Sequence, residues 1–319
     1  MTHINAPVTG ISTSLRRRRW ALWLAVAAIL VQPFASAVAH AQHFGEWGPA
    51  VSIDPLGARG VNTSANEGCP YEAPDGDLLF FASNRIGGAG MNDIWVASRQ
   101  TDDTWGAPTN LTAVNSPFMD FCPTPLPGNR LLFVSTRDSL CGGTHSADIY
   151  YTRLHPVHGW LPPQHLGCEV NSAFEELSPS LVEAGGQTML FFSSNRAGSQ
   201  DIYVSLQFPD GSWATPTPVS ELNSGADDAR PNIRKDGLEM VFDSTRDGGA
   251  PEIYTSSRTS VFDPWSAPQR LGPNVNSTAT ETRATISRDG KRLYFGTTRA
   301  AVLGSSDVFV SERTGPGKK

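Results

Sequence analysis

The sequence predicts an all-β fold, a five-bladed β-propeller of four-stranded antiparallel blades. One unit recurs five times, successive copies begin roughly 50 to 60 residues apart, and each copy holds only short strand-like runs. Repeats of that period, with four strands per unit, are typical of circular folds in which each unit forms one blade.

Each copy opens on a tryptophan and continues to an asparagine that is followed by serine or threonine. The tryptophans are Trp47, Trp105, Trp160, Trp213 and Trp265, and the asparagines are Asn62, Asn115, Asn171, Asn223 and Asn276. We expect the indole rings to pack between blades and the asparagine side chains to hydrogen-bond turn backbone.

Two further strand-like runs complete each copy. The first run ends in an arginine (Arg85, Arg137, Arg196, Arg246 or Arg299), and the second begins with an acid (Asp93, Asp148, Asp201, Glu252 or Asp307). Their β-branched and aromatic residues, bounded by Gly, Asn and Asp, favour strands joined by tight turns. We expect Arg85 to pair with Asp93, and Arg196 with Asp201, across the intervening loops.

The two ends of the repeat region predict how the propeller closes. Residues 47–53 carry the outermost-strand phrase without the other three strands, and residues 307–313 carry the third-strand phrase without a fourth. The N-terminal strand can therefore complete the last blade, which leaves no open sheet edge.

The predicted organisation is a signal peptide over 1–41, the propeller over 42–313 and a flexible tail over 314–319. A basic cluster from Arg16 to Arg19 precedes an apolar run that is short for a membrane span, and Ala39 and Ala41 supply the small residues of a cleavage site. We expect a periplasmic or secreted protein with no membrane span in the mature chain.

The net charge limits the classes of binding partner, and the cysteine content indicates disulfides. The net charge is −6, and loss of the four leader arginines makes the chain more negative, which argues against nucleic acid or an anionic membrane. Four cysteines in an exported protein indicate disulfides. We favour Cys141–Cys168, because both lie in loops of one blade, while Cys69–Cys122 is open if the inner strands approach closely.

An acidic residue stands just before the innermost strand of every blade. These acids are Glu67, Asp120, Glu176, Asp228 and Glu281. They would form a ring at the mouth of the central channel. Either the ring binds a cation or a basic ligand, or each acid builds its own blade by pairing with neighbouring groups.

The repeat breaks two residues after each acid, where Cys69, Cys122, Ser178, Arg230 and Arg283 stand. Strand alternation points these residues toward the same side as the acids, so we expect Arg230 and Arg283 to join the acids in one ligand-binding face. No catalytic motif is present, but a glycosidase needs only two suitably placed carboxylates, and the acid ring could supply them.

The phrase N-R-x-G-G-x-G-x-N-D-I-W over 84–95 is the clearest copy of a pattern that covers 44–313. The pattern resembles the WD-like repeat of TolB-type periplasmic β-propeller proteins. That resemblance implies a rigid propeller that binds proteins or ligands at the cell envelope.

The functional expectation is an exported, monomeric, TolB-like scaffold that binds an envelope protein or a small polar ligand such as an oligosaccharide. The alternative is a carbohydrate-active glycoside hydrolase that uses two channel-mouth carboxylates. We expect no cofactor, with calcium as the candidate ion.

Overall fold

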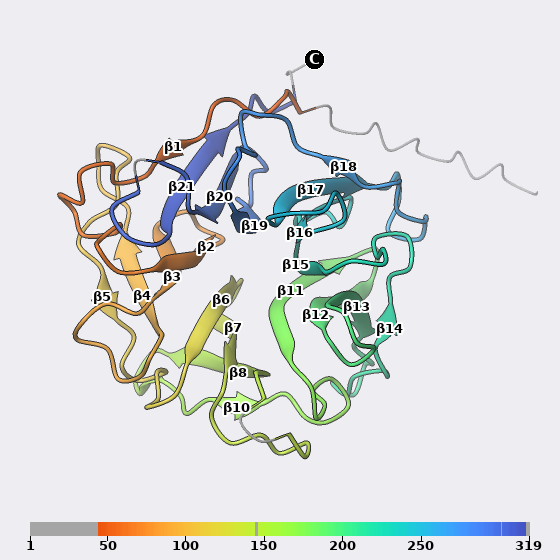
Figure 1. The fold of residues 1–319 in the computed structure, drawn as a ribbon. Helices are drawn as coiled ribbons and strands as arrows, with labels where there is room; N and C mark the ends of the chain where they lie inside the picture. Colours follow the sequence, from red (N-terminus) through yellow and green to blue (C-terminus); the bar gives the residue numbers. More distant parts are fainter. Residues whose placement is uncertain (1–43, 144–145, 301, 317–319) are drawn as a thin grey trace, which may run out of the picture. The chain divides into compact units, whose positions relative to one another are not determined.

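The computed structural model describes residues 44–143, 146–300 and 302–316, and within these ranges every regular element is a β-strand. Five antiparallel sheets stand around a central axis (Figure 1). The predicted five-bladed β-propeller is confirmed. The predicted signal peptide over 1–41 lies outside the described residues.

The blades follow one another along the chain, and the first strand of each blade is the innermost. The first blade contains β2 (Glu67–Glu72), β3 (Leu78–Ser83), β4 (Asp93–Ser98) and β5 (Thr109–Asn110). The second contains β6 (Asp120–Leu126), β7 (Arg130–Ser135), β8 (Asp148–His155) and β10 (Gln164–His165), with β9 (Gly159–Trp160) also paired to β8.

The remaining three blades repeat this order. The third contains β11 (Glu176–Ala184), β12 (Gln187–Ser194), β13 (Asp201–Leu206) and β14 (Thr217–Pro218). The fourth contains β15 (Asp228–Ile233), β16 (Glu239–Ser244), β17 (Glu252–Ser257) and β18 (Gln269–Arg270). The fifth contains β19 (Glu281–Ile286), β20 (Arg292–Thr297), β21 (Asp307–Glu312) and β1 (Val51–Ser52).

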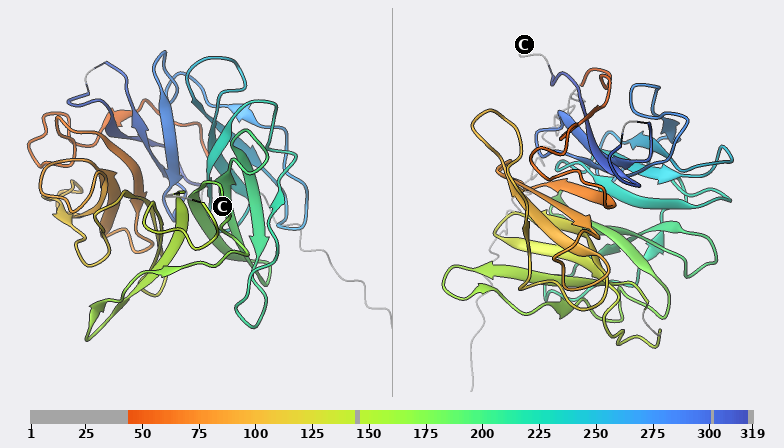
Figure 2. Two further views of the ribbon diagram at one scale, coloured as in Figure 1. Left: turned by 60° about the horizontal axis from the view of Figure 1, so that its bottom comes forward. Right: turned by 60° about the vertical axis from the view of Figure 1, so that its left-hand side comes forward.

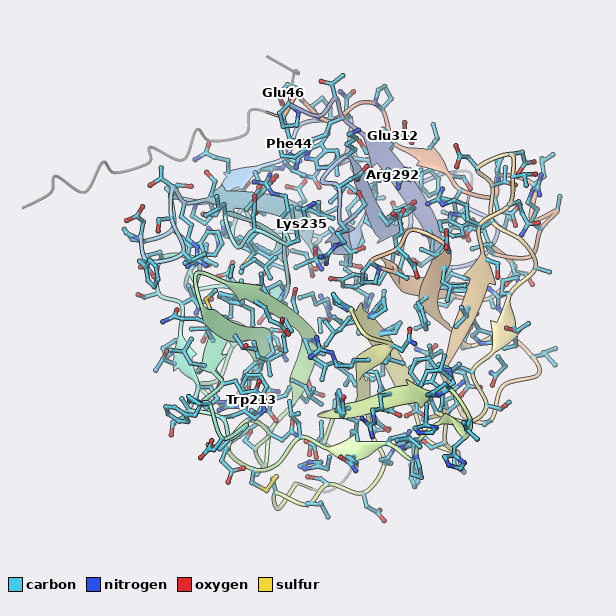
Figure 3. The ribbon with its side chains drawn as sticks, turned by 180° about the vertical axis from the view of Figure 1, so that it is seen from behind. Phe44, Glu46, Trp213, Lys235, Arg292 and Glu312 are labelled. Carbon is cyan, nitrogen blue, oxygen red and sulfur yellow. A yellow bond between two sulfur atoms is a disulfide. The ribbon has the colours of Figure 1, made fainter. Side chains whose placement is uncertain are left out.

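The N-terminal strand closes the ring, as the repeat predicts. Strand β1 pairs antiparallel with β21, with Val51 opposite Val310, so the last blade is built from both ends of the repeat region (Figures 1 and 2). Phe44 extends this closure, because its ring lies 4.6 Å from the Arg234 guanidinium and 4.1 Å from that of Arg313 (Figure 3). Closure satisfies the backbone groups that an open edge would expose.

The repeated asparagines bond strand backbone rather than turns. Asn171 is typical, because its Oδ1 accepts from the Ile149 amide at 2.8 Å and its Nδ2 donates to the Ile149 carbonyl at 3.0 Å. The other four asparagines make the same pair of bonds to the third strand of the preceding blade. Each asparagine thus ties one blade to the next.

The repeated tryptophans pack into the apolar core between neighbouring blades, as the sequence predicts. Trp47, Trp105 and Trp265 are buried, and each carries an arginine guanidinium over its ring. The Trp265 ring meets Phe191 of the third blade edge-on at 6.3 Å, so it joins two blades into one apolar core. Such edge contacts add to the burial of apolar area.

Both disulfides are present. Cys141 and Cys168 are joined within the second blade, and Cys69 and Cys122 join the inner strands of the first two blades with their Cα atoms 4.7 Å apart. Disulfides persist in oxidising compartments, which agrees with an exported protein. Across the part of the chain that the structure describes, no helix is long and apolar enough to cross a membrane.

Candidate functional site

Each of the five repeated acids pairs with the arginine of its own blade, and we call this buried ion pair the latch. Glu176 is fully buried, and it accepts hydrogen bonds from the Ser194 hydroxyl at 2.8 Å and from Arg196 at 2.7 Å. The Ser172 backbone and hydroxyl complete the set. Glu67, Asp120, Asp228 and Glu281 are equally buried and pair with Arg85, Arg137, Arg246 and Arg299.

The latch replaces the pairing expected from the sequence. Arg85 pairs with Glu67 instead of Asp93, and Arg196 pairs with Glu176 instead of Asp201. Asp93 instead accepts backbone N–H groups of the Gly-rich loop, from Ala89 and Gly90. Nearness in sequence suggested the wrong partner, because the acid of the inner strand lies directly opposite the serine of the second strand.

A backbone bulge explains why the acids do not share a face with the residues two positions later. Cys69, Cys122, Ser178, Arg230 and Arg283 all have positive φ angles, between 46° and 58°. The pairing register of every inner strand shifts at this point. The extra residue breaks the alternation of side chains, so the acid turns into the blade while the bulge residue turns into the channel.

A cavity of about 340 Å³ opens where the innermost strands of the fourth and fifth blades begin. We call it the arginine mouth; its lining includes Asn66, Arg230, Thr280, Thr282, Arg283 and Ser306. Arg230 and Arg283 are the charged residues of this lining, so the two predicted arginines do lie together. The carboxylates of the five latch acids are not part of it.

Asp243 is a buried carboxylate beneath the two arginines, and the repeat pattern does not predict it. One Asp243 oxygen accepts the Arg230 guanidinium, and the other accepts the Arg283 backbone amide at 2.9 Å. The corresponding second-strand positions hold Ala82, Val134, Ser193 and Gly296. The sequence does contain a sign of this carboxylate, because the run V-F-D-S-T-R has an aspartate where the other copies carry a small or apolar residue.

Burial and a neighbouring like charge both lower the pKa of the Arg283 guanidinium. Desolvation is the larger cause, and repulsion from Arg230 adds to it, so the pKa of the Arg283 guanidinium falls to about 10 although Asp243 partly offsets this. Two guanidinium groups and the single carboxylate of Asp243 thus make the wall of the arginine mouth positively charged.

The opposite wall of the channel is apolar. The Cys69–Cys122 disulfide packs with Ala82, Val134 and Ala147 in one buried cluster. A cavity along the channel is lined by both cysteines and by both arginines, so the two walls face one space.

Two exposed carboxylates occupy the rim at this end. Asn66 and Thr280, which line the arginine mouth, each directly precede a latch acid, and the same repeat position holds Glu175 and Asp227 in the third and fourth blades. Gln200 connects them, because its backbone amide donates to Asp227 at 3.0 Å and its side-chain Nε2 donates to Glu175 at 3.3 Å.

The other end of the channel carries a separate cavity of about 140 Å³. Its lining combines apolar residues such as Leu126 and Leu181 with Glu183, Lys235 and Arg288. Lys235 is labelled in the view from behind (Figure 3). Within the described residues, no group of three or more His, Cys, Asp or Glu side chains could hold a metal ion.

No protein-family model and no curated protein matches the chain. The fold is shared with the catalytic domain of a GH62 α-L-arabinofuranosidase from Coprinopsis cinerea, at 13% identity and a TM-score of 0.52 over 85% of this chain and 98% of that chain. An endo-1,4-β-xylanase from Bacteroides thetaiotaomicron matches at 12% identity and a TM-score of 0.52, over 81% and 96%. TolB from Acinetobacter baumannii matches at 15% identity with a TM-score of 0.44, over 84% and 55%.

This comparison corrects the main functional expectation. The arabinofuranosidase and the xylanase named above match with TM-scores above 0.5, and so do a second α-L-arabinofuranosidase, from Podospora anserina, and a family-43 glycoside hydrolase. At such low identity the likeness shows a shared fold alone. Because these neighbours are glycoside hydrolases, they contradict the expectation of a TolB-like binding scaffold and agree better with the carbohydrate-active alternative.

Proposed function

We propose that this protein is a carbohydrate-active propeller of the glycoside hydrolase class that takes an oligosaccharide at the arginine mouth. One observation carries the proposal: Glu175 and Asp227, two exposed carboxylates on adjacent blades, are held by one glutamine on the rim of this end of the channel. The carboxylate pair thus differs from the latch acids that the repeat suggested.

Glycoside hydrolysis needs two carboxyl groups on either side of the scissile bond. One donates a proton to the leaving oxygen, and the other acts as a base toward water or as a nucleophile. Glu175 and Asp227 meet the requirement of solvent access, whereas the latch acids are fully buried and paired with arginine. The hydrogen bonds from Gln200 hold both groups in place, which is the role of a positioning residue.

The lining of the arginine mouth suits a sugar. Thr280, Thr282 and Ser306 contribute hydroxyl groups and Asn66 an amide, and these groups can exchange hydrogen bonds with sugar hydroxyls. An exported protein would meet such polymers outside the cytosol.

Hydrolysis of plant and bacterial oligosaccharides, followed by the release of reducing ends, tests the proposal. We expect Glu175→Gln and Asp227→Asn each to lower kcat by about 10² to 10⁴-fold, because each removes one proton-transfer or nucleophilic group. Asp210→Asn is the matched control, since Asp210 is exposed on a distant hairpin and bonds Ser212. Full activity in both rim variants, or no hydrolysis of any substrate in the panel, would refute the assignment.

A further inference from the structure

We propose that the arginine mouth selects an acidic sugar, so that the substrate is an oligosaccharide bearing uronic acid carboxylates. This inference rests on the proposed function and names the substrate class of the same site. It depends on the charge, the unused hydrogen-bond donors and the unpaired acceptor of the cavity.

Arginine is the charged residue type of the cavities at this end. The arginine mouth and the channel cavity below it are both lined by Arg230 and Arg283, and an adjoining cavity is lined by Arg283 and Asn92. Asp243 is the carboxylate that contacts both arginines, and it is almost fully buried beneath them. Within the cavity, two guanidinium groups face one carboxylate and leave a net positive charge, while Glu175 and Asp227 lie on the rim outside its lining.

Most of the guanidinium donors at this site have no protein acceptor. A guanidinium group has five N–H donors. Among the described residues, the Arg283 guanidinium donates to the Thr282 hydroxyl at 3.2 Å, and that of Arg230 donates to one Asp243 oxygen. The second Asp243 oxygen is taken by the Arg283 backbone, so the Arg283 guanidinium has no carboxylate of its own.

Asn92 adds a buried hydrogen-bond acceptor that no described residue satisfies. Its side-chain Oδ1 is buried and has no hydrogen-bond partner among the described residues, and Asn92 lines a cavity together with Arg283. A buried acceptor without a donor is unfavourable by the full desolvation of that group. A sugar hydroxyl could donate to it while the adjacent carboxylate meets Arg283.

A carboxylate fits this arrangement better than a neutral hydroxyl. The planar arginine fork pairs with a carboxylate through two parallel N–H···O bonds, and such charge-assisted bonds are stronger than neutral ones. Burial is the larger cause of the lowered pKa of Arg283 and repulsion from Arg230 is the next, and an anion between the two guanidinium groups would relieve that repulsion. A neutral sugar would leave that repulsion in place.

Calorimetric titration of the mature protein with an oligogalacturonate and with its methyl-esterified form tests the inference, because the two probes differ in the carboxylate alone. We expect the acid to bind about 10- to 100-fold more tightly, which is the range for hydrogen bonds to a charged group. Arg283→Gln and Arg230→Gln should each abolish the preference. Arg288→Gln, at the other end of the channel, should retain it.

Arg283→Lys separates charge from geometry. Lysine keeps the positive charge without the planar fork, so an intermediate preference is expected. A full preference in the lysine variant would overturn the paired-bond geometry. Circular dichroism of each variant confirms that a lost preference reflects the site instead of the fold.

The remaining outcomes distinguish the two proposals. Equal affinity for acid and ester would overturn the acidic-sugar inference while the carbohydrate-active proposal stands. Inorganic phosphate or sulfate that binds as tightly as the oligogalacturonate, with no contribution from the sugar, would overturn the inference in favour of a simple anion site. Hydrolysis of neutral oligosaccharides without any binding of uronates would also reject the acidic substrate.

Discussion

The channel has two unlike walls that are built on the same backbone bulge. In the first two blades the bulge residues Cys69 and Cys122 are joined by a disulfide, whereas in the fourth and fifth blades Arg230 and Arg283 share the single carboxylate of Asp243. The first wall restrains the unfolded chain and stabilises the fold, and the second brings like charges together. The same bulge therefore carries a covalent cross-link on one side and two cations on the other, and the side chain at the bulge decides which.

Breaking the latch should have the largest effect, and it should be equal on both sides. Arg85→Met in the first blade leaves the fully buried Glu67 carboxylate without its arginine partner. Arg246→Met in the fourth blade does the same to Asp228. We expect each variant to lose about 3–5 kcal/mol of unfolding free energy, as measured by urea denaturation. The exposed pair Arg130–Glu183 is the control, since Arg130→Met should cost at most about 1 kcal/mol. A large loss on one side alone would show that the latch differs between the walls.

Removing the disulfide wall should have the next largest effect. The double variant Cys69→Ser and Cys122→Ser should lose about 2–4 kcal/mol, because the bond closes a long stretch of the unfolded chain. Cys141→Ser with Cys168→Ser is the matched reference, and its sequence separation of 27 against 53 predicts a slightly smaller loss. If the 69–122 variant were as stable as the wild type, the stabilising role of this wall would have to be abandoned.

Removing charge from the arginine wall should have the smallest effect and the opposite sign. Arg283→Met should gain about 0.5–2 kcal/mol at pH 7, because it removes a partly desolvated cation that faces Arg230. A loss of stability instead would mean that Arg283 supports the fold.

The pH dependence sharpens this last comparison. The pKa of Arg283 is lowered to about 10 in the folded protein and lies higher in the unfolded chain. Its unfavourable contribution is complete below pH 10 and declines as the pH rises above 10, where the folded state releases the proton first. The advantage of Arg283→Met should therefore shrink above pH 10, and a constant difference up to pH 11 would argue against the lowered pKa.

The residues that recur in every copy predict the architecture of the propeller well and its function poorly. The five blades, the closing strand and the packing of the tryptophans follow from residues that recur in every copy. Glu176 also recurs, yet its role was ambiguous, because a repeated acid fits both a channel ring and an internal latch. Asp243 breaks the repeat at one position and was missed, because its meaning depends on Arg230 and Arg283 in neighbouring strands.

The number of blades, the order of strands and the closure of the ring follow from the sequence, because local strand patterns and turn residues recur with a fixed period. Which side chains face the channel becomes clear only from the three-dimensional fold. A single positive-φ bulge reverses the side-chain alternation in each inner strand, and no pattern of polarity reveals where it falls. The bulge also explains why Glu67 and its equivalents lie inside the blades while Arg230, Arg283 and Asp243 meet at the arginine mouth.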